Sequence, residues 1–253
     1  MTTIGARTQD PAPLASPSLP PSFSIRLFGS MSVEVHGQPI RRLRSRKAFW
    51  LLALLALRAG KEVERNWLAG ALWPNVETSQ ARANMRPALS ELRGALGDQA
   101  FRLDAAGRNT IRLDIEGAEV DVLTFDALVC SVEPGDWERA AELYCGELLQ
   151  GCDEDWVFQE RESRGRACLE TWLRLGELSL TVCDGAKAIE SFSRALGVDP
   201  LSNIAQRSLM STLEMTGDRN GALHSYREYA NLLRRETGAF PDEQTADLYL
   251  QLR

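Results

Sequence analysis

The stretch SQARANMRPALSELRGAL, at residues 79–96, separates its apolar and its cationic side chains onto two neighbouring faces of a helix. Successive residues of an α-helix lie about 100° apart around its axis, and this spacing assigns each side chain to a face. The apolar face holds Ala81, Met85, Ala88, Leu89, Leu92 and Leu96. The adjoining face, which we call the arginine stripe, holds Arg82, Arg86, Arg93, Ser79 and Ser90. The stretch therefore predicts a helix that buries its apolar face and presents cations beside it.

Cations and hydroxyls along one helix face suit the major groove of DNA. Arginine can donate two hydrogen bonds to guanine or hold a phosphate, and serine can reach either group. The alternative is an ordinary solvated face, but such faces usually mix both signs of charge, and the arginine stripe is nearly free of carboxylates. We therefore expect the arginine stripe to contact DNA, with the solvated face as the alternative.

Two strands and two helices are expected before this stretch. Apolar residues at every second position, bounded by glycines, predict short antiparallel strands within residues 24–29 and 31–37. An apolar helix follows, with Ser45 as its predicted N-cap and Gly60 as its predicted C-cap. A second, shorter helix is expected over about residues 65–72, where a Trp-Pro pair ends it because proline disfavours a helix at the residue before it. The long helix thus comes second in a helix–turn–helix order.

A β-hairpin is expected after the long helix. The segments FRLD (101–104) and NTIRLD (109–114) alternate apolar and polar residues around a loop that contains Gly107. Arg108 lies beside this glycine, and an arginine at the tip of a β-ribbon can enter the adjacent minor groove of DNA. The alternative is an ordinary exposed loop arginine.

A proline interrupts the expected long helix. Pro87 removes one backbone hydrogen bond and its ring clashes with the carbonyl of Ala83. We therefore expect a kink between Ala83 and Pro87, which would re-aim Arg82 relative to Arg93.

A basic cluster, RRLRSRK at residues 41–47, precedes the first helix. Its last two cations, Arg46 and Lys47, are candidate phosphate contacts, because they stand next to the expected DNA-binding elements. The alternative is a solvated turn, which we favour for most of the cluster.

The chain from about residue 121 onward predicts helices only, and it contains an internal repeat. At an offset of 34 residues, five positions carry identical or similar residues: Asp184/Asp218, Ala188/Ala222, Ile189/Leu223, Ser191/Ser225 and Phe192/Tyr226. A small residue followed four positions later by an aromatic one, at this offset, is the tetratricopeptide spacing. A chance likeness of two amphipathic helices is the alternative.

The two parts of the chain also differ in the sign of their net charge. The 253 residues carry a net charge of −6. Residues 23–115 hold 15 Lys and Arg against 8 Asp and Glu, which is +7, whereas residues 116–253 hold 13 against 26, which is −13. A basic module followed by an acidic one suits a DNA-binding domain joined to a protein-interaction domain. The acidic total therefore does not exclude a nucleic-acid partner.

Several classes of protein are disfavoured by what the sequence lacks. The longest apolar run has ten residues, whereas a bilayer span needs about 20, and no secretory signal is present. The five cysteines form no C-x-x-C pair, and the two histidines, His36 and His224, suit neither a zinc site nor a catalytic site. No phosphate-binding glycine motif occurs. We expect no enzyme activity, no cofactor, no metal, no membrane partner and a cytoplasmic location.

Several stretches of the first half resemble the OmpR-type winged helix, in the version found in SARP (antibiotic regulatory protein) activators. They are RSRKAFWLLALLALRAGKEVERNWLAGALWP (44–74), ARANMRPALSELRGALG (81–97), RNTIRLD (108–114) and VDVLTFDAL (120–128). The second half resembles the bacterial transcriptional activation domain of the same family. The matching stretches are YCGELLQG (144–151), DEDWVFQERESR (153–164), AIESFSRALGVDP (188–200) and SYREYANLLRRETGAFPDEQTADLY (225–249).

The resemblance implies an α+β winged-helix domain followed by an all-α, tetratricopeptide-like domain. The expected divisions are a disordered leader at 1–22, the winged helix at 23–116 and the helical activation domain at 117–253. In such proteins the third helix and the hairpin contact DNA, which here implies contacts from the arginine stripe and Arg108. The loop that contacts RNA polymerase corresponds to Asn75, Val76, Glu77 and Thr78.

The function implied is a transcriptional activator that binds direct repeats near a promoter and recruits RNA polymerase, with a homodimer on DNA as a candidate assembly. A protein-interaction adaptor, in which the helical repeat binds peptides and the winged helix does not bind DNA, remains the alternative. An enzyme would require a nucleophile or metal cluster that the sequence does not supply.

Overall fold

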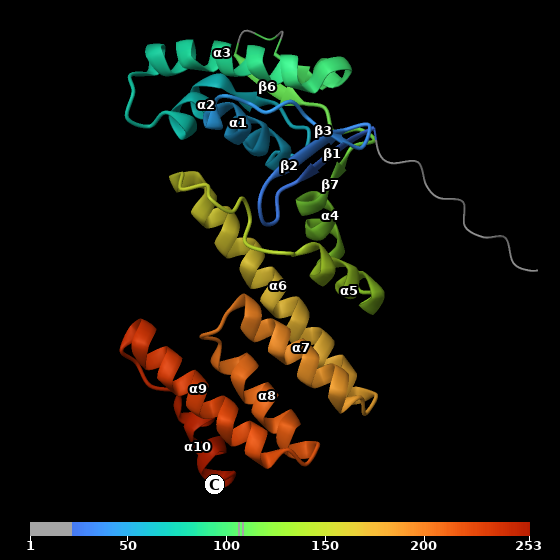
Figure 1. Ribbon diagram of the computed structural model, residues 1–253, viewed down its shortest axis with the longest axis vertical. Helices are drawn as coiled ribbons and strands as arrows, with labels where there is room; N and C mark the ends of the chain where they lie inside the picture. The colour runs from blue at the N-terminus through green and yellow to red at the C-terminus, as the bar shows by residue number, and fades with distance from the viewer. Residues whose placement is uncertain (1–21, 106, 108) are drawn as a thin grey trace, which may run out of the picture.

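The computed structural model describes residues 22–105, 107 and 109–253. The N-terminal part of the chain builds an α+β region and the C-terminal part is helical (Figure 1). Nearly all of the expected leader (1–22) and Arg108 lie outside the described residues. Both therefore stay predictions.

A four-stranded sheet opens the fold, in the order β3-β2-β1-β7. Its strands are β1 (Phe23–Arg26), β2 (Ser32–Val35), β3 (Gln38–Pro39) and β7 (Glu119–Val120). The two predicted strands, β1 and β2, pair antiparallel as expected, and β7 adds to the free edge of β1 in parallel. Ile25 in β1 and Leu27 just after it are both fully buried as the sequence predicts, although Ser24 between Phe23 and Ile25 is buried too.

Three helices pack beside this sheet: α1 (Arg46–Leu57), α2 (Arg65–Leu72) and α3 (Thr78–Leu96). The Ser45 hydroxyl accepts a hydrogen bond from the backbone N–H of Ala48, which confirms the predicted N-cap. The predicted C-cap at Gly60 is wrong, because α1 ends at Leu57 with Arg58 as its C-cap. Gly60 instead completes the turn that follows, at a φ of 76°.

The hairpin forms the second sheet, in the order β4-β6-β5, from β4 (Val63–Glu64), β6 (Thr110–Leu113) and β5 (Leu103–Asp104). Leu103 lies opposite Leu113, which confirms the predicted hairpin. The prediction that Phe101 belongs to its first strand is wrong. Phe101 lies in the 3₁₀ turn η1 (Gly97–Arg102) and is 68% exposed, because the chain leaves α3 through this turn before it becomes extended.

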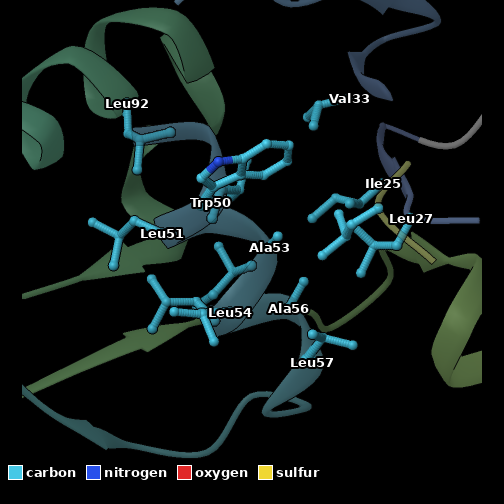
Figure 2. Packing of buried hydrophobic residues seen from close by; sticks show 14 of the residues in the cluster. Ile25, Leu27, Val33, Trp50, Leu51, Ala53, Leu54, Ala56, Leu57 and Leu92 are labelled. Atoms are coloured by element: carbon cyan, nitrogen blue, oxygen red, sulfur yellow. The ribbon is translucent and has the colours of Figure 1, made fainter. Parts of the chain in front are cut away.

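Helix α1 is buried on nearly every side. Figure 2 shows Trp50 of α1 between Leu92 of α3 and the sheet side chains Val33 and Ile25. Residues from Trp50 to Ala56 of α1 are all buried. A helix that is apolar all round is stable only at the centre of a core. Helix α1 is therefore the element against which both the sheet and α3, the candidate DNA-binding helix, pack.

The core continues past the expected domain boundary after residue 116. Helix α4 (Asp121–Leu128) begins with a carboxylate that accepts hydrogen bonds from the backbone N–H groups of Leu27 and Phe28, at 2.8–3.0 Å. Helix α5 (Pro134–Leu143) follows, and Leu148 then forms a β-bridge to Phe28. One hydrophobic cluster runs from β1 to Cys168. The boundary stays a prediction, but the packing is shared across it.

The remaining helices form an antiparallel succession: α6 (Asp155–Thr181), α7 (Gly185–Val198), α8 (Asn203–Met215), α9 (Arg219–Thr237) and α10 (Glu243–Gln251). Two of the five pairs of positions matched by the 34-residue repeat have matched roles. The carboxylates of Asp184 and Asp218 each cap a helix, and Ala188 and Ala222 are both fully buried. Among the described helices, none is both long enough and apolar enough to cross a bilayer.

Two of the five cysteine thiols are shielded from solvent. Cys152 and Cys168 are buried, and burial raises the pKa of the Cys168 thiol to about 12. Because the thiolate is the reactive form, we expect both thiols to be inert towards a disulfide reagent such as DTNB at pH 8. The exposed thiols Cys130, Cys145 and Cys183 are expected to react quickly. Counting fast-reacting thiols before and after unfolding in denaturant checks this. Rapid reaction of all five in the folded protein would contradict it.

Candidate nucleic-acid interface

Helix α3 divides into the two faces that the sequence predicts. Its buried residues are the predicted apolar face: Ala81, Met85, Ala88, Leu89, Leu92 and Leu96. All members of the arginine stripe are exposed. Figure 1 shows α3 along the edge of the α+β region that lies farthest from α7–α10. The stripe is therefore carried on a rigid helix that the helical region does not cover.

The helix runs unbroken through its proline. It is continuous from Thr78 to Leu96 with Pro87 inside it, so the proline does not end the helix. The expected re-aiming of Arg82 relative to Arg93 stays a prediction. Pro87 itself is exposed and, with Ser90, lines a groove of about 440 Å³ between α3 and the basic segment at residues 41–44.

A fourth arginine, Arg65, joins the electrostatic field of the stripe. Partial burial lowers the pKa of Arg65, and the charges of Arg82, Arg93 and Arg86 lower it further. Four cations from two helices therefore lie close enough to disfavour one another. Sequence reasoning missed Arg65, because it stands at the start of α2 and outside the periodic pattern of α3; no local signal links the two positions.

The start of α3 differs from the middle of the stripe. The Ser79 hydroxyl donates to the carboxylate of Glu77, and this hydrogen bond lowers the Glu77 pKa. Ser79 is thus occupied within the chain, whereas Ser90 is exposed on the helix face. The preceding loop is exposed at Asn75, Val76 and Glu77, and so is Thr78, the first residue of α3. Its exposure suits a docking loop, and its contact with polymerase stays a prediction.

The two candidate phosphate contacts, which are the first two residues of α1, face the C-terminal half of the chain. The Lys47 ammonium donates to both oxygens of Glu154 at 2.8 Å, and the Arg46 guanidinium donates to the carbonyl of Gly151 at 2.6 Å. The structure thus gives both side chains a partner within the chain that the sequence did not indicate. Contact with phosphate would require either cation to leave that partner, and it stays a prediction.

Comparisons with known proteins agree with this arrangement. Residues 134–253 match the family model of the bacterial transcriptional activator domain. The regulatory protein AfsR of Streptomyces coelicolor is 29% identical over 202 residues, which is 76% of this chain and 20% of that protein. AfsR of Streptomyces griseus is 28% identical over 214 residues, 78% of this chain and 21% of its own. The chain thus spans about a fifth of the length of these relatives.

A solved structure shares the fold over almost the whole chain. It is titled Mycobacterium tuberculosis EmbR in complex with low affinity phosphopeptide, and it aligns with a TM-score of 0.68 at 21% sequence identity. The alignment covers 92% of this chain and 65% of that one. At this identity the likeness concerns the fold alone, and it confirms an α+β winged-helix region followed by a helical domain.

Fold and comparisons together make the chain similar to bacterial transcriptional regulators that carry a winged helix and an activator domain. Residues 134–253 match the bacterial transcriptional activator domain, and the similarity to the AfsR proteins supports the predicted resemblance to the SARP-type activators. This family is a class of transcriptional regulators and not of enzymes.

Proposed function

We propose that this chain is a sequence-specific DNA-binding transcriptional activator that acts in the cytoplasm and reads the major groove with α3. The observation that carries the proposal is the exposed arginine stripe together with Arg65. Among the ion pairs of the described residues, none neutralises Arg82, Arg86 or Arg93. Cations that repel one another without a carboxylate partner are stabilised by an anionic ligand, and DNA supplies phosphates in a regular array.

The position of α3 also supports more specific proposals about how the chain binds DNA and its protein partners. Because α3 lies at the outer edge of the α+β region, a duplex against it leaves the helical region free for protein partners (Figure 1). We propose that two chains bind direct repeats near a promoter and that the loop at residues 75–78 contacts RNA polymerase. Arg108, beside Gly107 in the hairpin loop, is proposed to enter the adjacent minor groove.

Direct measurement of DNA binding tests the proposal. Genomic fragments retained by the purified full chain should share a direct-repeat motif, and one such fragment should bind with nanomolar-range affinity. The logarithm of the binding constant should fall linearly with the logarithm of salt concentration, by about 0.9 per phosphate contact. Fluorescence anisotropy at several salt concentrations gives this slope. If no fragment is retained even at low salt, the proposal fails and the adaptor alternative, motivated by the 34-residue repeat, takes its place.

A further inference from the structure

Arg65 stands where the second helix meets the hairpin sheet. It follows β4 directly and is the first residue of α2. Strand β4 pairs with β6, so that Val63 lies opposite Ile111 and Glu64 opposite Thr110. The sheet therefore places Arg65 beside the loop that joins the two strands of the hairpin.

Three carbonyl groups of that loop accept hydrogen bonds from Arg65. Its guanidinium Nη2 donates to the carbonyl oxygens of Ala105 and Gly107, at 2.7 and 3.3 Å. Its backbone N–H donates to the carbonyl of Asn109 at 2.8 Å. Ala105, Gly107 and Asn109 are thus tied to one residue, and residues held in this way lose less conformational freedom on binding.

The same guanidinium lies within electrostatic reach of the arginine stripe. The charges of Arg82, Arg93 and Arg86 act on it, and its Nε is buried without a hydrogen-bond partner among the described residues. Arg93 reaches the hairpin as well, because its Nη2 lies 3.5 Å from the carbonyl of Leu103. Arg65 therefore links the hairpin to the face of α3 that carries the cations.

We propose that Arg65 is a positioning residue for DNA recognition: it holds the hairpin loop at a set distance from the arginine stripe, so that loop and helix engage one duplex together. This inference rests on the DNA-binding function proposed above and adds the residue that couples its two contact elements. Arg65 needs no base contact for this role. It affects DNA recognition by fixing the position of the hairpin loop.

Two substitutions separate the geometry of Arg65 from its charge. Arg65→Met removes both, whereas Arg65→Lys keeps the positive charge but replaces a planar, multi-donor group with a single nitrogen that has no fork geometry. If positioning matters, lysine should rescue poorly. Arg166→Met is the matched control, because Arg166 is an exposed arginine of α6 paired with Glu162 and lies outside the proposed interface.

In the free full-length protein, we expect amide exchange at Gly107 and Asn109, measured by NMR, to accelerate in both Arg65 variants and not in the control. On the selected DNA fragment, we expect both variants to bind about tenfold more weakly, the cost of ordering roughly one more loop residue on binding. Hydroxyl-radical footprints should lose protection only on the minor-groove side of the site. Methylation protection of guanines by α3 should stay.

The outcomes separate this inference from the proposed function. If the wild-type chain binds no DNA, the function fails, and the exchange measurement still reports whether Arg65 holds the loop. If the wild type binds and Arg65→Lys binds with the same affinity and footprint, the positioning role is overturned. A uniform loss of protection across the whole site would likewise overturn it, since that result indicates a general loss of folding or charge.

Discussion

Arg86→Ala is expected to weaken binding of the full chain to its selected DNA fragment by about 1–3 kcal/mol, a loss of roughly 5- to 150-fold in affinity. Arg86 lies near the middle of α3, one turn after Arg82 and two turns before Arg93, and all three are exposed. A side chain at the centre of a recognition helix is the one most completely desolvated by the groove. Its loss therefore costs more than the loss of a peripheral phosphate contact.

Anisotropy titrations with the selected fragment and with a scrambled fragment measure this effect. A base contact made by Arg86 should make the loss larger on the selected fragment, whereas a phosphate contact should weaken both fragments equally and reduce the salt slope by about 1. Thermal unfolding should change little, by less than about 0.5 kcal/mol, because Arg86 is exposed. Arg166→Ala, which removes an equal charge from α6, should leave binding unchanged. Unchanged affinity of Arg86→Ala on the selected fragment would remove α3 from the interface.

Phe192→Ala is expected to destabilise the helical region by about 3–5 kcal/mol, the range for removing a buried aromatic ring. Phe192 is 1% exposed and anchors a cluster with Ala188 and Leu209. Its ring lies against the backbone of α6 at Gly176, where an added Cβ would stand 2.6 Å from Cζ of Phe192. The ring therefore fills a space that only a glycine at position 176 leaves open, and its removal empties the contact between α6 and α7.

The complementary change, Gly176→Ala, should destabilise the same contact from the other side. Overpacking costs about 1–3 kcal/mol and outweighs the gain of up to about 1 kcal/mol in helix propensity. Gly197→Ala in α7 is the control, because a Cβ there meets nothing within 4 Å, and it should be neutral or stabilising. Urea unfolding of the three variants gives the free energies. Equal effects of the two glycine substitutions would show that the ring does not occupy this space.

Local periodicity explains how much of the fold could be predicted from the sequence. The six buried residues of α3 are the six that the helical wheel assigns to its apolar face, and α2 spans the predicted residues 65–72. The repeat also translates directly into structure, since its two aspartates cap helices and its two alanines are buried. In each case neighbouring residues along one element decide the outcome, so the pattern is readable without a tertiary fold.

Strands of only two residues could not be predicted from local periodicity. Strands β4 and β7 have no period that could be recognised, and they exist because partner strands supply their hydrogen bonds. Phe101 illustrates the opposite error, since it continues an alternating pattern yet lies in a 3₁₀ turn and is exposed. Short segments follow their surroundings more than their own propensity.

The sequence by itself determined which faces are apolar, which helix carries the cations and where the helical repeat lies, because these properties depend on residues a few positions apart. Tertiary structure decided the partners of the cations, because those partners are distant in the chain. It turned Arg46 and Lys47 towards Gly151 and Glu154, and it brought Arg65 to the hairpin and to the arginine stripe. A charge has a sign in the sequence, but its energy depends on the groups that the fold places around it.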